Sequence, residues 1–258
     1  MLVTDFNKAQ GHWLLARMGK KVLRPGGKEQ TLKLIDSLHI SGSDDIVEFA
    51  PGLGFTASLA LQHNPRSYVG IDADTDAVSS LQKKIRGGNI SIIQGTAAQT
   101  GLQEESKDKV FGEAMLTMQA DHRKSEIIRE AHRILKKGGL YAIHELGLEP
   151  DTLDEDVKAE IQKKLAQTIK VNARPLTGKE WSGLLEKEGF RIIGVYTNPM
   201  RLLETGRIID DEGFLRTIKI GFNLLIYPAA RKRILEMRKV FRKYSNCMNG
   251  IVLIAEKK

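Results

Sequence analysis

The sequence predicts an α/β fold in which a mostly parallel sheet carries helices on both faces. Between residues 45 and 147, short apolar runs alternate with amphipathic segments, and the links between them are short. This alternation is typical of strands and helices in an open parallel sheet. The first apolar run also ends in a glycine-rich turn, Gly52-x-Gly54-x-x-Ala57, ahead of a helical segment. Such a turn is how these sheets build a nucleotide site.

The composition indicates a globular chain without a membrane span. The chain has 258 residues, of which 41% are hydrophobic and 28% charged, enough for one large domain or a core with a cap. No apolar run approaches the roughly 20 residues that a membrane helix needs, and residues 1–10 lack a signal-peptide pattern. The single cysteine, Cys247, excludes an internal disulfide and a cysteine-rich zinc site, and the six histidines show no ligand spacing. We therefore expect a cytoplasmic protein without a metal.

The positive charge is concentrated near the C-terminus. Residues 201–258 contain 13 lysines and arginines against 6 acidic residues, a net charge of +7 out of +8 for the chain. The simplest interpretation is a solvated helix face. An anionic substrate, an acidic membrane surface and nucleic acid are the alternatives.

Residues 1–44 are expected to form a helical lid. The apolar residues between positions 6 and 18 fit one amphipathic helix, and a second helix is expected around residues 32–38. Between them, Pro25-Gly26-Gly27 predicts a turn. That turn is either a simple helix–helix connection or the hinge of a lid over the ligand site.

The elements of the core follow from periodicity and from turn residues. The strands are expected at 45–50, 67–72, 89–94, 109–115 and 140–146. Helices should follow the glycine-rich turn, begin at Asp74 or Thr75, and run through residues 127–137, where Gly138-Gly139 would end the last of them. Further along, a charged helix is expected at 151–170, a capping box at 177–180, and strands at 191–196 and 250–255.

Residues 204–245 predict a long helical insertion between the last two strands. Its final helix carries one apolar stripe: Ala230, Ile234, Met237, Phe241 and Tyr244. The sheet faces already have their own helices, so this stripe must be buried elsewhere. We expect it to pack with residues 5–30, around Trp13 and Leu14, as a roof over the site. A dimer interface or a membrane-surface helix would use the same stripe.

Two acidic residues point to the kind of nucleotide site. Asp72 ends the second strand about twenty residues after the first glycine, where an acid can reach a ribose diol. Dehydrogenases and methyltransferases share this feature. Glu48, inside the first strand, separates them, because a dinucleotide enzyme usually has only apolar residues there.

With these residues in place, the chain resembles the class I methyltransferases that depend on S-adenosylmethionine (SAM). Glu48-Phe-Ala50-Pro-Gly52-Leu-Gly54 is similar to that family's Glu-x-Gly-x-Gly-x-Gly, with Ala50-Pro51 as the departure. Residues 130–139 are similar to its Glu-x-x-Arg-x-Leu-Lys-Pro-Gly-Gly, with Lys137 in place of the proline. Residues 26–31 also resemble a segment of small-molecule N-methyltransferases of the phosphoethanolamine type.

The resemblance implies a Rossmann-like sheet of seven strands, parallel except for one. The final strand would insert between the fifth strand and the 191–196 strand. We therefore expect a SAM-binding core at 45–200, a helical cap insertion at 201–248 and the final core strand at 249–258, with 1–44 as the N-terminal lid.

The resemblance also implies roles for residues along the strand ends. Glu48 would meet the cofactor's amino group, Asp72 the ribose hydroxyls, and the backbone at the glycine-rich turn the methionine part. The expected cofactor-binding residues are Glu48, Ala50, Gly52, Gly54, Asp72, Ala73, Thr96, Ala97, Glu113 and Ala114. Met115 and Met118 are either core residues or soft walls of a sulfonium pocket.

The resemblance implies transfer of a methyl group from SAM to a small-molecule acceptor by in-line displacement. A general base is needed only if the acceptor arrives protonated. The catalytic candidates are His144, Glu145 and Glu113, with His12 behind them. A monomer and a homodimer both fit the sequence, and peripheral membrane contact stays open.

Two other functions remain as alternatives. A nucleic-acid methyltransferase is favoured by the basic C-terminal region, but the fourth strand lacks the Asp/Asn-Pro-Pro-Tyr/Phe turn of adenine enzymes. A Pro-Cys nucleophile for cytosine is absent as well, so a nucleic-acid partner is not expected. The glycine spacing also favours an NAD(P)-dependent oxidoreductase, whereas Glu48 argues against one.

Overall fold

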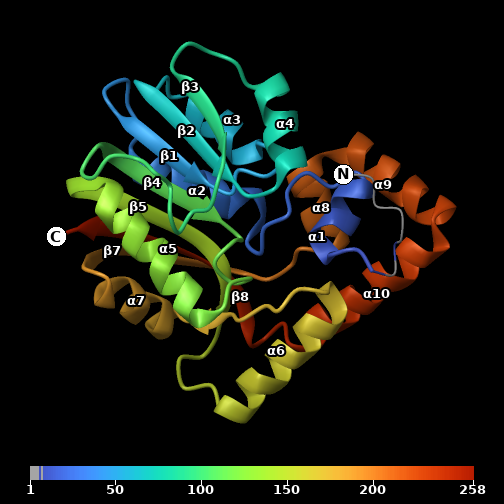
Figure 1. Ribbon diagram of the computed structural model, residues 1–258. Coiled ribbons are helices and arrows are strands. Elements are labelled where there is room, and N and C mark those ends of the chain that lie inside the picture. Colours follow the sequence, from blue (N-terminus) through green and yellow to red (C-terminus); the bar gives the residue numbers. More distant parts are fainter. Residues whose placement is uncertain (1–5, 7) are drawn as a thin grey trace.

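A computed structural model describes residue 6 and residues 8–258 as one sheet with helices on both faces and a helical layer beyond one edge (Figure 1). The strands are β1 (Asp45–Phe49), β2 (Ser67–Asp72), β3 (Ile90–Gln94), β4 (Lys107–Glu113), β5 (Leu135–Leu148), β6 (Leu176–Thr177), β7 (Phe190–Pro199) and β8 (Met248–Lys257). The helices are α1 (Gly11–Arg17), α2 (Gly27–Leu38), α3 (Phe55–Leu61), α4 (Thr75–Lys84), α5 (Asp121–Ile134), α6 (Glu155–Ile169), α7 (Gly178–Lys187), α8 (Thr205–Glu212), α9 (Phe214–Ile226) and α10 (Pro228–Lys243).

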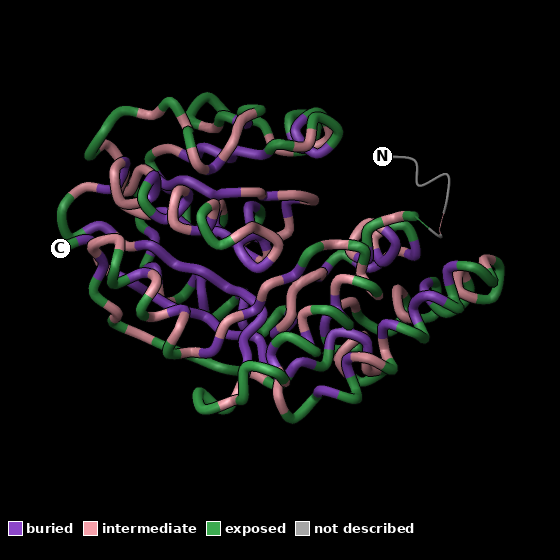
Figure 2. The backbone as a smooth tube through the Cα atoms, turned by 60° about the horizontal axis from the view of Figure 1, so that its bottom comes forward, coloured by how far each residue is buried: buried purple, intermediate pink, exposed green. Residues whose placement is uncertain are grey.

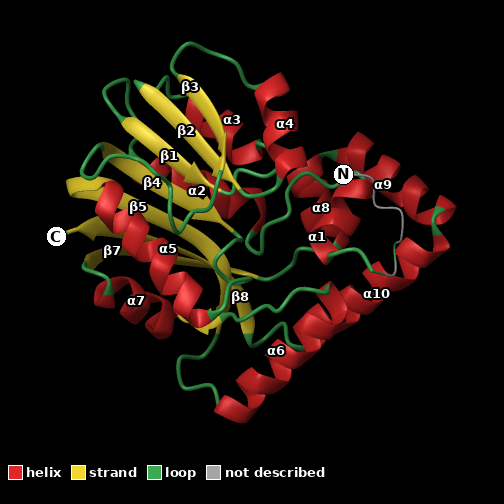
Figure 3. Cartoon of the chain, viewed as in Figure 1, coloured by secondary structure: helices red, strands yellow, loops and turns green. Residues whose placement is uncertain are grey.

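The predicted position of the final strand is confirmed. The strands run β3-β2-β1-β4-β5-β8-β7, and β8 lies antiparallel between β5 and β7. The two-residue strand β6 pairs with β5 and was not predicted. Because β1 to β5 are parallel, their carboxyl ends meet at one edge, where open α/β sheets bind ligands (Figure 3).

The alternation of side chains along the strands supplies two apolar layers. Helices α2, α3 and α4 cover one face, where Ile46 and Phe111 point, and α5 and α7 cover the other, where Val47 and Val110 point. Figure 2 shows the buried strands between more exposed outer segments. The capping box at α7 forms as expected, since Thr177 and Glu180 bond each other's backbone N–H groups.

The predicted end of α5 was wrong. The helix stops at Ile134, and β5 begins at Leu135, which pairs with Lys107 of β4. Leu135 is fully buried, and Lys136 forms an ion pair with Asp108 (2.7 Å) instead of capping a helix. Burial of this leucine against the sheet therefore outweighs the helix-terminating signal of the two glycines that follow.

The predicted packing of the final cap helix is confirmed. The apolar stripe of α10 is buried in one cluster with Leu14, Leu15 and Met18 of the N-terminal segment. The cluster also contains Ile161 and Leu165 of α6, a helix for which no such contact was predicted. Together α1, α6 and α10 form a layer beyond the carboxyl ends of the strands (Figure 1). The division into a core domain and separate lid segments stays a prediction.

Candidate functional site

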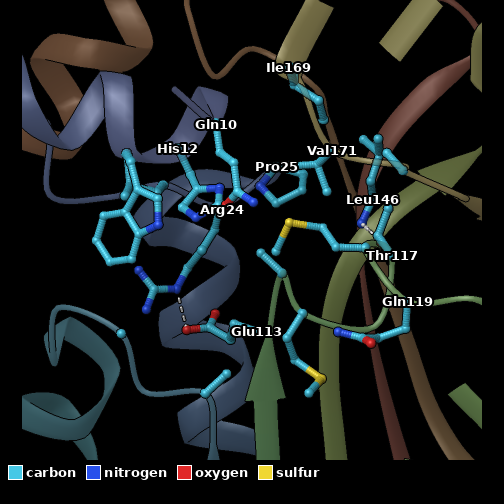
Figure 4. Close-up of a pocket in the computed structure, with 18 of the residues that line it drawn as sticks. Gln10, His12, Arg24, Pro25, Glu113, Thr117, Gln119, Leu146, Ile169 and Val171 are labelled. Carbon is cyan, nitrogen blue, oxygen red and sulfur yellow. Dashed lines mark hydrogen bonds and ion pairs between the residues drawn. The ribbon is translucent and has the colours of Figure 1, made fainter. Parts of the chain in front are cut away.

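A cavity of about 670 Å³ lies between the carboxyl ends of the strands and the layer made by α1, α6 and α10 (Figure 4). Its volume is in the range of sites that hold a small molecule or a cofactor. The turns after β1, β2, β3 and β4 line one half of it. The helical layer lines the other half.

The glycine-rich turn after β1 has the tight backbone that its sequence predicts. Ala50, Gly52 and Gly54 all have positive φ angles, of 52°, 55° and 81°. The Ala50 N–H donates to the Ile71 carbonyl (2.8 Å), which ties the turn to β2. Glycine is favoured at position 54, because its φ is positive and a Cβ atom there would lie 2.4 Å from the Leu81 side chain. Ala50 and Gly52 line the cavity, whereas Gly54 packs against α4.

Asp72 lies at the cavity wall at the end of β2. One carboxylate oxygen accepts from the Gly52 N–H (2.9 Å) and the other from the Asp74 N–H (2.9 Å). These bonds fix the side chain beside the glycine-rich turn. An ionised carboxylate has about four acceptor positions, so two stay available for further donors.

The turns after β2 and β3 form the neighbouring part of the wall. Ala73 lines it from the first turn and Thr96 and Ala97 line it from the second, together with Arg123 of α5. Arg123 Nη2 donates to the Thr96 hydroxyl oxygen (2.8 Å), which holds the arginine at this part of the wall.

Glu48 is buried inside β1, and its carboxylate accepts a hydrogen bond from the Tyr68 hydroxyl (2.6 Å). Burial raises the pKa of Glu48 to about 8, against the effect of that hydrogen bond and of Arg24. The side chain does not line the cavity but lies beneath the turn.

Glu113, at the end of β4, is the hub of a buried polar network. Its carboxylate accepts from Arg24 Nε (2.5 Å), from the Thr31 hydroxyl (2.8 Å) and from the Thr56 hydroxyl, and His144 Nδ1 lies 2.8 Å away. Burial raises the pKa of Glu113, but Arg24 and His144 outweigh burial and hold it at about 2. The carboxylate is therefore charged and occupied by donors. Figure 4 shows Arg24, from the segment between α1 and α2, reaching Glu113.

His144 and Glu145, on β5, are fully buried and do not line the cavity. His144 Nε2 accepts from the Gly26 N–H (3.1 Å), which leaves Nδ1 to donate to Glu113. Glu145 accepts the backbone N–H groups of Met115, Leu116 and Thr117 at 2.8 to 3.0 Å. Both residues shape the strand ends, and neither faces the space where an acceptor would lie.

Three residues of this network, Arg24, Thr31 and Thr56, were not predicted as site residues. Each reaches Glu113 from a different segment, so no spacing in the sequence marks the set. The one local signal was Pro25-Gly26-Gly27, which directs Arg24 and the start of α2 towards the sheet.

The half of the cavity beneath the helical layer is apolar. Its lining includes Trp13, Leu15, Leu23, Met118, Leu146, Leu165, Ile169, Val171, Met200, Leu202, Met237 and Phe241. Its polar residues are few and include Gln10, His12 and Thr117. Burial lowers the pKa of His12, so its imidazole is neutral at neutral pH.

Within the described part of the chain, acidic, histidine and cysteine side chains form no group that could hold a metal ion.

Comparisons with known proteins agree with this geometry. A family model described as a methyltransferase domain matches residues 47–143. A protein of Haemophilus influenzae described as uncharacterized is 32% identical over 251 residues, which cover 96% of this chain and 98% of that protein. An uncharacterized methyltransferase of Synechocystis is 28% identical over 136 residues, 52% of this chain and 63% of that protein.

Two solved structures share the fold at low identity. Phosphoethanolamine N-methyltransferase 2 of Haemonchus contortus, in complex with S-adenosyl-L-methionine, superposes with a TM-score of 0.71 at 18% identity over 96% of this chain and 56% of that one. The cyclopropane synthase MmaA2 of Mycobacterium tuberculosis gives 0.71 at 15% identity over 99% of both chains.

Residues 47–143 thus match a methyltransferase domain, and the chain shares the fold of SAM-dependent methyltransferases, with SAM as its cofactor. The matched domain decides against the oxidoreductase alternative. It leaves the methyl acceptor open.

Proposed function

We propose that this enzyme methylates an apolar small molecule that lies under the helical layer, with SAM along the strand ends. The observation that carries the proposal is the division of the cavity into a polar half at the strand ends and an apolar half beneath α1, α6 and α10. A polar cofactor and an apolar acceptor would each meet a matching wall.

The residues at the strand ends fit SAM. Asp72 has acceptor positions left for the two ribose hydroxyls, and Ala50 and Gly52 offer a wall without bulky side chains to the methionine part. Ala73, Thr96 and Ala97 would flank the adenine. Ala114, at a positive φ of 52°, would bring the backbone after β4 close to the reacting end. Glu48 would support the turn from below, and Gly54 would allow the turn to pack on α4.

The chain mainly has to align its substrates and exclude water. Bound SAM supplies a methyl group on a sulfonium sulfur, which leaves as a neutral thioether, so no metal or covalent intermediate is required. Glu113 holds the lid residue Arg24 at the reacting end of the cavity (2.5 Å). Through this contact the lid would shield the site from solvent.

If the acceptor arrives protonated, His12 is the best-placed base. It lines the cavity beside the apolar half and is neutral at neutral pH because burial lowers its pKa. The candidates from strand β5 and its neighbour, His144, Glu145 and Glu113, would act as positioning residues instead, since their acceptor atoms are already engaged.

A transfer assay with matched acceptors tests the apolar acceptor. The enzyme is incubated with SAM labelled in its methyl group and with pairs that share a nucleophile, such as a phenol and its long-chain alkyl derivative. We expect labelled product mainly from the alkylated member of each pair. The variant Val171→Asp, which places a charge in the half-buried wall, should lose that preference while still binding SAM. Equal turnover of both members by the wild-type enzyme would contradict an apolar acceptor.

A further inference from the structure

Helix α9 presents an apolar face to solvent. Several of its large apolar side chains are more than half exposed, with Leu215 at 82% and Phe222 at 61%. They are Phe214, Leu215, Ile218, Phe222, Leu225 and Ile226, which recur every three or four residues and so form one stripe, the outer face of α9. Soluble monomers rarely expose such a contiguous stripe, and one of this kind marks an interaction site.

The opposite side of α9 is fixed to the lid. Ile220 is buried, and Asn223 Nδ2 donates to the carbonyl oxygen of Met18 (2.9 Å). Leu224 packs against the cluster formed by α1, α6 and α10. The helix is therefore held in one orientation, and the outer face points away from the body of the enzyme. In Figure 1, α9 lies at the rim of the molecule, far from the sheet edge at β7.

Unpaired basic residues accompany this face. Lys219 projects from α9 itself, and Arg231 and Lys232 are exposed at the start of α10, directly after α9. In the described part of the chain these three residues form no ion pair, whereas Arg238 and Arg242 are both held by Glu204 at 2.9 and 2.7 Å. Apolar side chains next to free cations are the composition of a helix that lies in an anionic membrane interface.

Helix α9 packs on the helical layer that roofs the cavity, through Leu224 on its inner side. The other side of the same helical layer supplies Trp13 of α1 and Met237 and Phe241 of α10 to the apolar half of the cavity. Helix α9 and the layer of α1, α6 and α10 beneath it thus lie between an exposed apolar surface and an enclosed apolar space.

We propose that the outer face of α9 docks on an anionic lipid bilayer, with its apolar side chains among the acyl chains and Lys219, Arg231 and Lys232 against the lipid phosphates. No helix of the described residues is both long and apolar enough to cross a membrane, so the contact is peripheral. Docking does not depend on the identity of the acceptor. If the acceptor is apolar as proposed above, docking also places the lid at the surface in which such a molecule would dissolve.

Vesicle sedimentation tests the proposal without any methyl transfer. The full chain is mixed with vesicles of equal parts phosphatidylglycerol and phosphatidylcholine, and with vesicles of phosphatidylcholine alone. We expect binding to the anionic vesicles that weakens as salt is added, because salt screens the lysines and arginines. The double variant Leu215→Ser/Phe222→Ser should bind at least about tenfold more weakly, since two apolar anchors are lost.

Two further variants separate the contribution of charge to vesicle binding from the general effect of a surface substitution. Lys219→Glu should reduce binding to the anionic vesicles, and Ile193→Ser, the same kind of change at a half-exposed residue of β7, should leave it unchanged. All variants are first checked for the wild-type melting shift with SAM. Wild-type protein that stays in the supernatant at low salt would overturn the proposal. So would a wild-type dimer without vesicle affinity that the double variant splits, because the face would then join two copies of the chain.

Discussion

Replacing Glu113 by glutamine should unlock the lid from the sheet. The carboxylate is buried and binds Arg24, Thr31, Thr56 and His144. Glutamine has nearly the same shape but no charge, and its amide NH₂ meets groups that also donate. Arg24 would then remain largely buried without its counter-ion, which is the costly way to break a buried pair.

The pKa of Glu113 gives the size of the expected loss of stability. It falls from 4.5 to about 2 in the folded protein. At 1.36 kcal/mol per pKa unit, the charged form therefore contributes about 3 kcal/mol to the free energy of unfolding. Because the folded-state pKa is depressed, this contribution is present above pH 4.5 and is lost as the pH falls towards 2. At neutral pH the variant should melt about 6 to 12 °C lower for a chain of this size.

Urea denaturation across a pH series measures this contribution. Wild-type protein should lose stability between about pH 5 and pH 2 more steeply than Glu113→Gln, because the variant lacks the titrating group. Glu186→Gln, the same change at an exposed residue of α7, should follow the wild-type curve. Parallel curves for wild type and Glu113→Gln would refute the idea that this carboxylate locks the lid.

Three other predictions concern the cap, the turn and the base. Phe241→Asp, in the cavity wall, should abolish methyl transfer while the protein still binds SAM and keeps its size in gel filtration; a change of size would point to an interface instead. Gly54→Ala should lower the free energy of unfolding by about 1–3 kcal/mol in urea denaturation, because its φ is positive and Leu81 occupies the space, whereas Gly88→Ala, with open space around it, should not. His12→Gln should lower kcat at least about 100-fold and remove the acidic limb of its pH profile if His12 is the base, and an unchanged profile would exclude that role.

The sheet could be predicted because its information is local. Apolar runs with turn residues mark each strand, and the position of the antiparallel β8 followed from the family resemblance. The boundary between α5 and β5 could not be read in this way. The glycines at 138 and 139 suggested a helix end, but the tertiary burial of Leu135 moved that end forward.

Two of the three predicted catalytic residues, His144 and Glu145, do not line the cavity, and tertiary contacts again explain why. His144 and Glu145 are adjacent on β5, so their side chains point to opposite faces of the sheet. One meets the turn before α2 and the other the backbone after β4, and both are satisfied there. Position at a strand end predicted that they lie near the site, but only the arrangement of neighbouring segments decides whether a side chain faces the substrate.

The exposed stripe of α9 was not predicted. Its residues are as apolar as those of a core helix, but only the stripe of α10 was singled out from the sequence. That stripe is buried as expected, through Met237 and Phe241, and α9 packs outside it. Tertiary contacts decide which of two successive apolar helices covers the other, and the sequence pattern does not show those contacts.

Calorimetry with SAM tests the central claim most directly, because the proposed site places the ribose against Asp72. Charge-assisted hydrogen bonds of this kind contribute roughly 1.5–3 kcal/mol, so Asp72→Ala should bind SAM about 10 to 100-fold more weakly than wild-type protein. The SAM affinity of Asp72→Asn, which keeps one oxygen for a hydroxyl, should lie between those of the wild-type protein and Asp72→Ala. Wild-type affinity in a folded Asp72→Ala variant would contradict this account of the site.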